Sequence, residues 1–397
     1  MSEDPRADLV AQQYRRWQYP EPIADLEIWL GNHWERFDPS HSHRMFWPDR
    51  PYQPEMDILV AGCGTNQAPT IAYTNPTARV IGIDISKESL DHGRYLKHKH
   101  GLRNLELRLL PIEEAGSLDR RFDLIVCSGV LHHMASPQAG MDALAGVLRP
   151  EGVAAIMLYA RYGRIGVEMM QAVFREMGLR QDEESLRLVR AGLAWLDPSH
   201  PVRTYLDNAP DLGFDAGLVD TFLHGRDVSF TVADCLDLVQ RAGLVFQGWF
   251  QQTPYHAPTL VEPDNEFLAA VSPLPERQMW TVMEPLRNGN GCHLFTACRP
   301  ERPGSTYRVD FADPRAPGFV PLWRLYAGVD GSEAVRPGWR IPLSPTSLAL
   351  ACQVDGERSI REIAARAAQP EQTALDVFEQ LWRLDFAAID LSGVTAA

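Results

Sequence analysis

Asp57-Ile-Leu-Val-Ala-Gly-Cys-Gly-Thr-Asn66, followed by Val80-Ile-Gly-Ile-Asp84, is the part of the chain that decides the fold. Both segments begin as short apolar runs rich in β-branched residues, which is typical of buried strands. The first run ends at Gly62 and Gly64, which can adopt backbone angles closed to other residues and let the main chain approach a ligand. The second ends at Asp84, a carboxylate placed to accept hydrogen bonds from a ribose. The pair predicts a doubly wound α/β sheet that holds an adenosine at the carboxyl edge of its strands.

The glycine turn also indicates which cofactor carries that adenosine. A dinucleotide fingerprint has a third glycine so that a helix N-terminus can meet the pyrophosphate, and Gln67 stands at that position here. Together with Gly82-Ile-Asp-Ile-Ser86 and Phe122-Asp-Leu-Ile-Val-Cys-Ser-Gly-Val-Leu-His-His133, the turn resembles the class I S-adenosylmethionine-dependent methyltransferase family. Alone, each motif also fits a tight turn or a helix cap. The resemblance implies a Rossmann-like, seven-stranded, mostly parallel sheet and S-adenosylmethionine as the cofactor.

The resemblance also implies a set of cofactor-binding residues. The backbone at Ala61, Gly62 and Gly64 would pass beneath the methionine part of the cofactor. Asp84 would hold the ribose hydroxyls, and Ile85 would pack on the adenine. Further positions expected in this site are Cys63, Asn66 and Ser128.

The adenine end departs from the family pattern. Pro111 stands where the family usually has an acidic residue, and Ile112 follows at the apolar position. Because proline offers neither a carboxylate nor an N–H group, adenine recognition is expected from the backbone of Ile112 or from Glu113. Asn66 likewise replaces a glycine that often follows the threonine. Both departures weaken single contacts and leave the architecture in place.

Strand and helix patterns alternate along the chain, which predicts right-handed crossovers and a parallel sheet. The expected strands are residues 58–61, 79–83, 105–109, 124–127 and 153–159. Expected helices are residues 67–73, 87–99 and 141–148. Residues 160–230 show helical periodicity without a clear strand, and the resemblance implies a helical insertion that covers the substrate. Two late strands, at 244–251 and 291–298, resemble the antiparallel last pair of the family.

The remaining segments flank this methyltransferase-like region, which we place at residues 51–300. Residues 1–50 carry Tyr14 and Tyr19, expected either to cover the cofactor as a lid or to dock an aromatic face on the core. A proline-rich connector precedes residues 319–397, where helix, Asp-Gly turn, two helices and a strand resemble small winged-helix modules related to PqqD. That module is expected to contact a peptide, or to serve only in dimerisation.

Histidines occur in two places, after the fourth expected strand and ahead of the helix that begins at Thr231. His132 and His133 come after the fourth strand, where an imidazole could serve as general base near neutral pH or simply pack the next helix. His224 and Asp227 form a second polar cluster ahead of the helix capped by Thr231. They face the substrate in one interpretation and tie the insertion to the sheet in the other.

Tyr159, Arg161, Tyr162 and Arg164 follow the fifth strand. Guanidinium groups bind carboxylates bidentately, so these residues suit an anionic substrate group beside the transfer site. The alternative is a basic loop on the surface.

Composition excludes several other classes of protein. The formal charge of −14, without a clustered basic segment, makes nucleic acid an unlikely partner. The six cysteines include no Cys-x-x-Cys pair, and His41-x-His43 has no further ligand nearby, so no metal is expected. No apolar run approaches 18 residues and the start is polar, so we expect a cytoplasmic protein without a membrane partner.

The predicted function is methyl transfer from S-adenosylmethionine to an N or O nucleophile of a peptide or protein side chain, or of an amino-acid-like acceptor. One alternative is a small-metabolite methyltransferase whose C-terminal domain only dimerises. Another is a noncatalytic protein that binds S-adenosylmethionine and recognises a peptide. The expected partners are thus a small-molecule or peptide acceptor and, in the dimerising alternative, a second copy of the chain.

Overall fold

The computed structural model describes residues 9–262 and 264–395, which form two compact units. The first unit comprises Met1–Glu35, Pro54–Phe246 and Arg287–Pro300, and the rest of the chain forms the second. Residues 36–53 and 247–286 therefore fold with the C-terminal domain, whereas the sequence had placed them in the lid and the methyltransferase-like region. Hydrogen bonds invisible in the sequence cause this difference, such as the one from the Leu391 N–H to the Pro48 carbonyl, 2.7 Å long.

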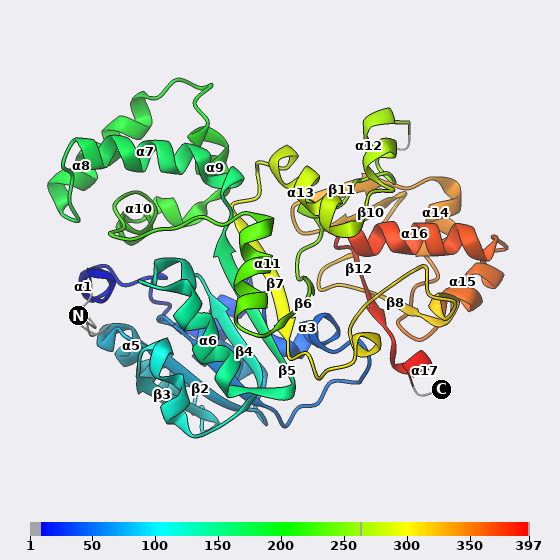
Figure 1. Ribbon diagram of the computed structural model, residues 1–397, viewed down its shortest axis with the longest axis horizontal. Helices are drawn as coiled ribbons and strands as arrows, with labels where there is room; N and C mark the ends of the chain where they lie inside the picture. The colour runs from blue at the N-terminus through cyan, green and yellow to red at the C-terminus, as the bar shows by residue number, and fades with distance from the viewer. Residues whose placement is uncertain (1–8, 263, 396–397) are drawn as a thin grey trace. The chain divides into compact units, whose positions relative to one another are not determined.

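The first unit contains most of a seven-stranded sheet in the order β3-β2-β1-β4-β5-β7-β6, whose edge strand β6 continues past the unit boundary at Phe246 (Figure 1). Neighbouring strands from β3 to β5 are parallel, and β7 runs antiparallel to β5. Every residue of β1 is buried, as expected for a central strand covered on both faces. The strands are β1 Asp57–Ala61, β2 Arg79–Asp84, β3 Leu105–Leu109, β4 Phe122–Ser128, β5 Leu148–Tyr159, β6 Val245–Trp249 and β7 Cys292–Cys298. The predicted Rossmann-like fold is confirmed.

Local capping chemistry sets where the crossover helices begin. The Ser86 side chain accepts from the Ser89 N–H at the start of α5, and Thr231 and Asp234 form a capping box at the start of α11. Among the described residues, no helix combines the length and apolarity needed to span a bilayer. The helices of the first unit outside the insertion are α1 Leu9–Arg16, α2 Leu26–Leu30, α4 Gln67–Thr74, α5 Lys87–Lys99, α6 Pro137–Val147 and α11 Val232–Arg241.

The predicted helical insertion follows the carboxyl end of β5 and gathers in one group of helices (Figure 1). Its own apolar core includes Val167, Phe174, Val189 and Phe222. Helices α7 and α9 approach closely because Gly166 has no side chain, and a Cβ there would lie 2.2 Å from the Val202 nitrogen. The insertion comprises α7 Ile165–Glu176, α8 Glu183–Trp195, α9 Val202–Asn208, the 3-10 turn Pro210–Gly213 and α10 Asp215–Phe222.

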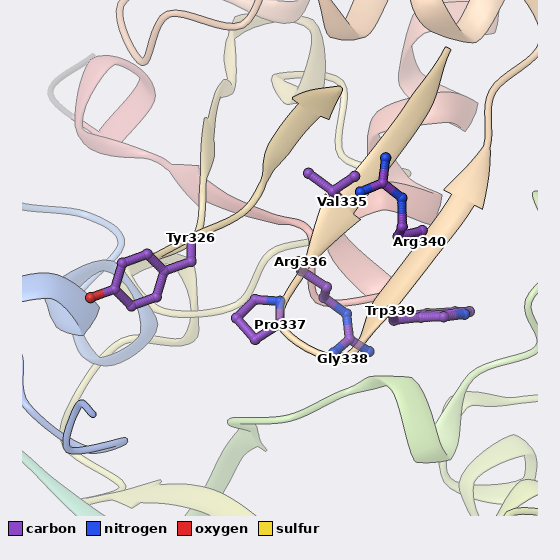
Figure 2. Close-up of a pocket in the computed structure, with 7 residues that line it drawn as sticks. All are labelled: Tyr326, Val335, Arg336, Pro337, Gly338, Trp339 and Arg340. Carbon is purple, nitrogen blue, oxygen red and sulfur yellow. The ribbon is translucent and has the colours of Figure 1, made fainter. Parts of the chain in front are cut away.

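The second unit contains two small sheets and a helical layer. Strands β9 Gly328–Asp330, β10 Glu333–Arg336 and β11 Trp339–Pro342 form an antiparallel sheet, and β12 Ala387–Asp390 pairs with β8 Val320–Trp323. The turn between β10 and β11 borders an open pocket that holds Arg336, Trp339 and Arg340 (Figure 2). Its helices are α3 Pro39–Phe46, α12 Glu266–Val271, α13 Glu276–Leu286, α14 Pro345–Ala351, α15 Ile360–Arg366, α16 Glu371–Arg383 and α17 Ser392–Thr395.

Candidate active site

The turn after β1 has the geometry that only glycine supplies. Gly62 and Gly64 have φ values of +71° and +54°, in the left-handed region. A Cβ on Gly62 would lie 2.4 Å from Cγ2 of Val130, in the loop after β4. The N–H groups of Gly62 and Cys63 both donate to the Ile83 carbonyl of β2, which fixes the turn at the carboxyl edge of the sheet.

Asp84 links this turn to the end of β2. Its Oδ2 accepts from the Gly64 N–H and its Oδ1 from the Ser86 N–H, both at 2.8 Å. Burial raises the pKa of Asp84, and the two N–H groups oppose that rise by stabilising the charged form. A carboxylate oxygen can accept more than one hydrogen bond, so Asp84 can also hold a ribose diol. These residues therefore fit the adenosine of S-adenosylmethionine.

The other predicted cofactor residues lie around the same edge. Ile85 is half-buried beside Asp84, and Ile112 is buried at the start of a 3-10 helix, Ile112–Leu118. The Glu113 side chain is exposed, and a contact of Glu113 or of the Ile112 backbone with the adenine stays a prediction. Pro111 adopts an extended conformation that begins this helix. The remaining positions in this group are Ala61, Cys63 and Asn66, all buried, and Ser128, half-buried at the end of β4.

The N-terminal segment lies against the glycine turn. The Thr65 hydroxyl donates to the Pro20 carbonyl at 2.8 Å, and a Cβ on Gly64 would lie 3.0 Å from the Pro20 ring. The Tyr19 hydroxyl donates to Asp211 of the insertion at 3.0 Å. This segment thus bridges the turn and the insertion, as a lid would. A direct contact of Tyr14 and Tyr19 with the cofactor stays a prediction.

Tyr14 from this segment meets a buried carboxylate that the sequence did not reveal. The hydroxyls of Tyr14 and Tyr159 donate to the two oxygens of Asp220, at 2.8 and 3.1 Å. Burial, and then the charge of Asp220, raises the pKa of both tyrosines well above the ordinary value. The charge of Asp84 adds a small part of the rise at Tyr14, so Tyr14 feels both the carboxylate at the end of β2 and Asp220. Tyr14 therefore links Asp220 to the predicted cofactor site.

Two histidines complete the cluster around Asp220. The rings of His133 and His224 stack with centroids 3.9 Å apart, and one ligand atom of each lies within 4.8 Å of an Asp220 oxygen. His133 Nδ1 bonds the Arg226 carbonyl at 3.0 Å, which leaves the Nε2 lone pair as a proton acceptor. His224 Nδ1 accepts from the Arg226 N–H at 3.0 Å, so its Nε2 carries the proton and offers no lone pair to a metal. The cluster thus combines one imidazole lone pair, at His133 Nε2, with the buried carboxylate of Asp220.

His132 packs against this cluster through the rings of His133 and Tyr159. Its side chain is fully buried, and its ring stacks on Tyr159 with centroids 3.8 Å apart. Burial lowers the pKa of His132 well below the ordinary value, and burial also lowers the pKa of His224 to about 4. Both imidazoles are therefore neutral at pH 7. This geometry favours the packing interpretation for His132.

Arg164 is not part of a basic surface loop, one of the two interpretations of the segment after β5, and its charge is paired inside the protein. Its guanidinium is fully buried, pairs with Asp227 at 2.8 Å and donates to the Tyr205 hydroxyl at 2.8 Å. It also lies 3.6 Å from the ring centroid of Tyr159, so it positions that tyrosine. Arg161 is exposed and Tyr162 half-buried, and their contact with a substrate stays a prediction.

Residues 53–189 match a family model described as a methyltransferase domain. An uncharacterized protein of Synechococcus sp. is 28% identical over 241 residues, which cover 58% of this chain and 56% of that protein. The ubiquinone biosynthesis O-methyltransferase of Acinetobacter baylyi is 27% identical over 143 residues, 34% of this chain and 59% of that enzyme. The chain spans about half the length of the curated relatives it matches.

Solved structures share the fold. PKMT2 from Rickettsia typhi superposes with a TM-score of 0.64 and 18% identity, covering 90% of this chain and 76% of that one. Its complex with AdoHcy gives a TM-score of 0.63 and 17% identity, covering 89% of this chain and 75% of that one. The similarity therefore extends beyond the residues matched by the family model.

Proposed function

We propose that this chain, whose residues 53–189 form a class I S-adenosylmethionine-dependent methyltransferase domain, transfers a methyl group to an amine nitrogen of a peptide or protein side chain. The observation that carries the proposal is the buried carboxylate of Asp220, held by two phenols beside the cofactor edge. Asp220 is 1% exposed, and a buried charge of this kind is stabilised by a cationic ligand. An ammonium group fits that requirement better than a phenol or a carboxylate does.

Aromatic rings around Asp220 support the same choice of acceptor. The ring centroids of Tyr14 and His224 are 6.1 Å apart, and His133 and Tyr159 pack edge to face at 5.5 Å. Faces of aromatic rings attract cations, most strongly where water is excluded. These residues would therefore hold an alkylammonium by its charge and its methylene groups together.

The transfer needs a neutral amine, so one proton must leave the ammonium first. We assign that proton to the Nε2 lone pair of His133, whose Nδ1 is fixed by the Arg226 carbonyl. S-adenosylmethionine supplies an electrophilic methyl group, which moves to the nitrogen as the bond to sulfur breaks. Asp220 and Tyr159 would align the nitrogen, and the N-terminal segment would exclude water.

A peptide acceptor is favoured over a free metabolite by the second unit. Its pocket combines the aromatic rings of Tyr326 and Trp339 with Arg336, whose guanidinium lies 4.9 Å from the Trp339 ring centroid (Figure 2). Tyr326 is 60% exposed and offers a contact surface for a chain outside the active site. Loss of this surface should raise KM for a peptide and leave KM for a free amine unchanged.

The test is methyl transfer from isotopically labelled S-adenosylmethionine to three acceptors. These are a lysine-containing peptide, the same peptide acetylated on the lysine nitrogen, and a catechol. The proposal requires label in the first alone, and Asp220→Asn should reduce that label while S-adenosylhomocysteine still binds. Label in the catechol but not in the lysine peptide would contradict the amine assignment and favour the O-methyltransferase relatives. Cofactor binding without transfer to any acceptor would favour the noncatalytic alternative.

A further inference from the structure

The pocket of the second unit is formed mainly by the hairpin that joins β10 to β11. It has a volume of about 570 Å³ and is bordered on another side by Tyr326 (Figure 2). Arg336 and Trp339 are the last pair of the hairpin, so their side chains lie on the same face of the sheet. Pro337 and Gly338 form the two-residue turn, in which Gly338 has a φ of +74°. The turn therefore holds Arg336 and Trp339 side by side.

Aromatic rings and hydrogen bonds hold the Arg336 side chain in place. Its Cζ lies 4.9 Å from the ring centroid of Trp339 and 5.5 Å from that of Phe386. Its Nε donates to the Leu384 carbonyl at 3.1 Å, and its Nη2 donates to the Thr253 hydroxyl at 3.2 Å. Its Nη1 has no acceptor among the residues that the structure describes. This guanidinium is therefore fixed in position and keeps one NH2 group for a ligand.

The charge around Arg336 is not balanced. Arg324 pairs with Asp385 at 2.6 Å, and the same carboxylate also accepts from the N–H groups of Gln252 and Thr253. Within the described part of the chain Arg336 forms no ion pair, although acidic residues outnumber lysine and arginine by 52 to 38. Burial lowers the pKa of Arg336, while Asp385 opposes this change and Arg324 adds to it. Two guanidiniums thus lie near one carboxylate, which leaves one positive charge in excess.

Arg340 lines the same pocket and shows the opposite arrangement. Its Nε donates to Glu333 at 2.9 Å and its Nη2 donates to Asp330 at 2.6 Å, so two carboxylates hold one guanidinium. The Arg340 side chain is exposed, where water solvates a charge, whereas Arg336 is half-buried and gains more from a counter-ion. Among the described residues, the arginine that most needs an acid is therefore the one without it.

We propose that Arg336 binds the carboxylate of an aspartate or glutamate side chain in the peptide acceptor. The inference rests on the proposed function for the nature of its ligand, and it adds which kind of residue the second unit recognises. A carboxylate oxygen would accept from Nη1 in the plane of the guanidinium, while the Trp339 ring contacts the face of that group. Tyr326 and Trp339 lie on opposite sides of the pocket and would contact apolar residues next to the acid (Figure 2).

Fluorescence anisotropy with a lysine-free peptide tests this site without any methyl transfer. The probe is a short peptide with a neutral fluorophore and blocked ends, whose only charge is one glutamate beside a phenylalanine. The full-length protein should bind it about tenfold or more tightly than the same peptide with glutamine, and added salt should reduce the difference. In Arg336→Gln the two peptides should bind alike, because the group that distinguishes them is gone.

The chain offers a matched control for the loss of one positive charge. Arg361 of α15 is exposed, pairs with Glu371 at 2.8 Å and does not line the pocket. Arg361→Gln should therefore keep the full preference for glutamate. Arg336→Lys keeps the charge but not the planar fork, and it should retain the fold by circular dichroism and only part of the preference.

Several outcomes would overturn the proposal. Equal affinity of the wild type for the two peptides contradicts it, and so does a glutamate preference that persists in Arg336→Gln. If Arg336→Gln does not fold, an unchanged preference in Arg336→Lys contradicts the assignment to the guanidinium. A peptide with a free C-terminal carboxylate and no acidic side chain should bind no better than the glutamine peptide. Tight binding of that peptide alone would show that the pocket recognises a chain end instead.

The binding test and the transfer test can fail separately. No glutamate preference, together with normal label transfer to the lysine peptide, would refute this site and leave the proposed function intact. A glutamate preference that depends on Arg336, without transfer to any acceptor, would keep the site and refute the methyl transfer.

Discussion

Replacing Gly62 with alanine should damage the cofactor turn in a way that can be measured and dissected. At φ +71° an alanine occupies the left-handed region, which costs about 1–2 kcal/mol. The new Cβ would also lie 2.4 and 2.8 Å from the two Cγ atoms of Val130, and such overpacking costs typically about 1–3 kcal/mol. Gly62→Ala should therefore lower the free energy of unfolding by about 2–5 kcal/mol.

The chain contains a matched control for this substitution. Gly243 has the same φ of +71°, but a Cβ there would meet no atom within 4 Å. Gly243→Ala should cost only the backbone part, about 1–2 kcal/mol, in urea unfolding followed by far-ultraviolet circular dichroism. Adding Val130→Ala to Gly62→Ala removes the two clashing methyl groups and should recover most of the difference between the two single variants.

Binding of S-adenosylhomocysteine provides a second measurement on the same variants. Gly62→Ala should also weaken S-adenosylhomocysteine binding in calorimetry, whereas Gly243→Ala should not. Equal destabilisation by Gly62→Ala and Gly243→Ala would refute the steric reasoning. Failure of the double variant to recover stability would refute it as well, because Val130 would then not be the limiting contact.

Two further predictions concern buried charge. Burial lowers the pKa of His256 to about 3, against about 6.5 in an unfolded chain. The folded protein therefore loses stability as pH falls below about 6.5, because only the unfolded chain binds the proton there. At pH 5 the free energy of unfolding, measured in urea, should be lower by about 2 kcal/mol. His256→Leu should remove this pH dependence of the free energy of unfolding, whereas the exposed control His98→Leu should not. An unchanged pH dependence in His256→Leu would contradict its assignment to His256. Arg164→Met should cost about 3–5 kcal/mol because it leaves Asp227 buried without its partner. Adding Asp227→Asn should restore part of this loss, and no restoration would show that the ion pair is not the cause.

The sheet could be predicted from the sequence because its signals are local. The expected helix 87–99 coincides with α5, and its Ser86 cap is visible as a serine before a helical pattern. The glycine turn and Asp84 can also be recognised from the sequence, because a turn residue and the end of a strand each have a local sequence pattern. The hydrogen bond from Gly64 to Asp84 joins residues 20 positions apart, a spacing fixed by one helix between two strands.

The acceptor side could not be predicted in the same way because it is assembled from distant segments. Asp220 is one acidic residue within α10, and its partners Tyr14 and Tyr159 lie 206 and 61 positions away. Its only local signal is an acidic residue in an otherwise uncharged run, Leu218-Val-Asp-Thr-Phe222. Arg164 was expected either to meet an anionic substrate group or to lie in a basic surface loop, and the structure instead pairs its charge with a buried partner, Asp227. Pairing between residues this far apart cannot be predicted from the spacing or periodicity of residues along the sequence.

Calorimetric titration of Asp84→Asn with S-adenosylhomocysteine tests the central claim most directly. The asparagine keeps the size of the side chain and an acceptor for one of the two N–H groups, of Gly64 or Ser86, but removes the charge offered to the ribose. Loss of a charge-assisted hydrogen bond of about 1.5–3 kcal/mol should weaken binding by about 10-fold to 150-fold. The circular dichroism spectrum should match that of the wild type. Wild-type affinity in the folded variant would contradict the account.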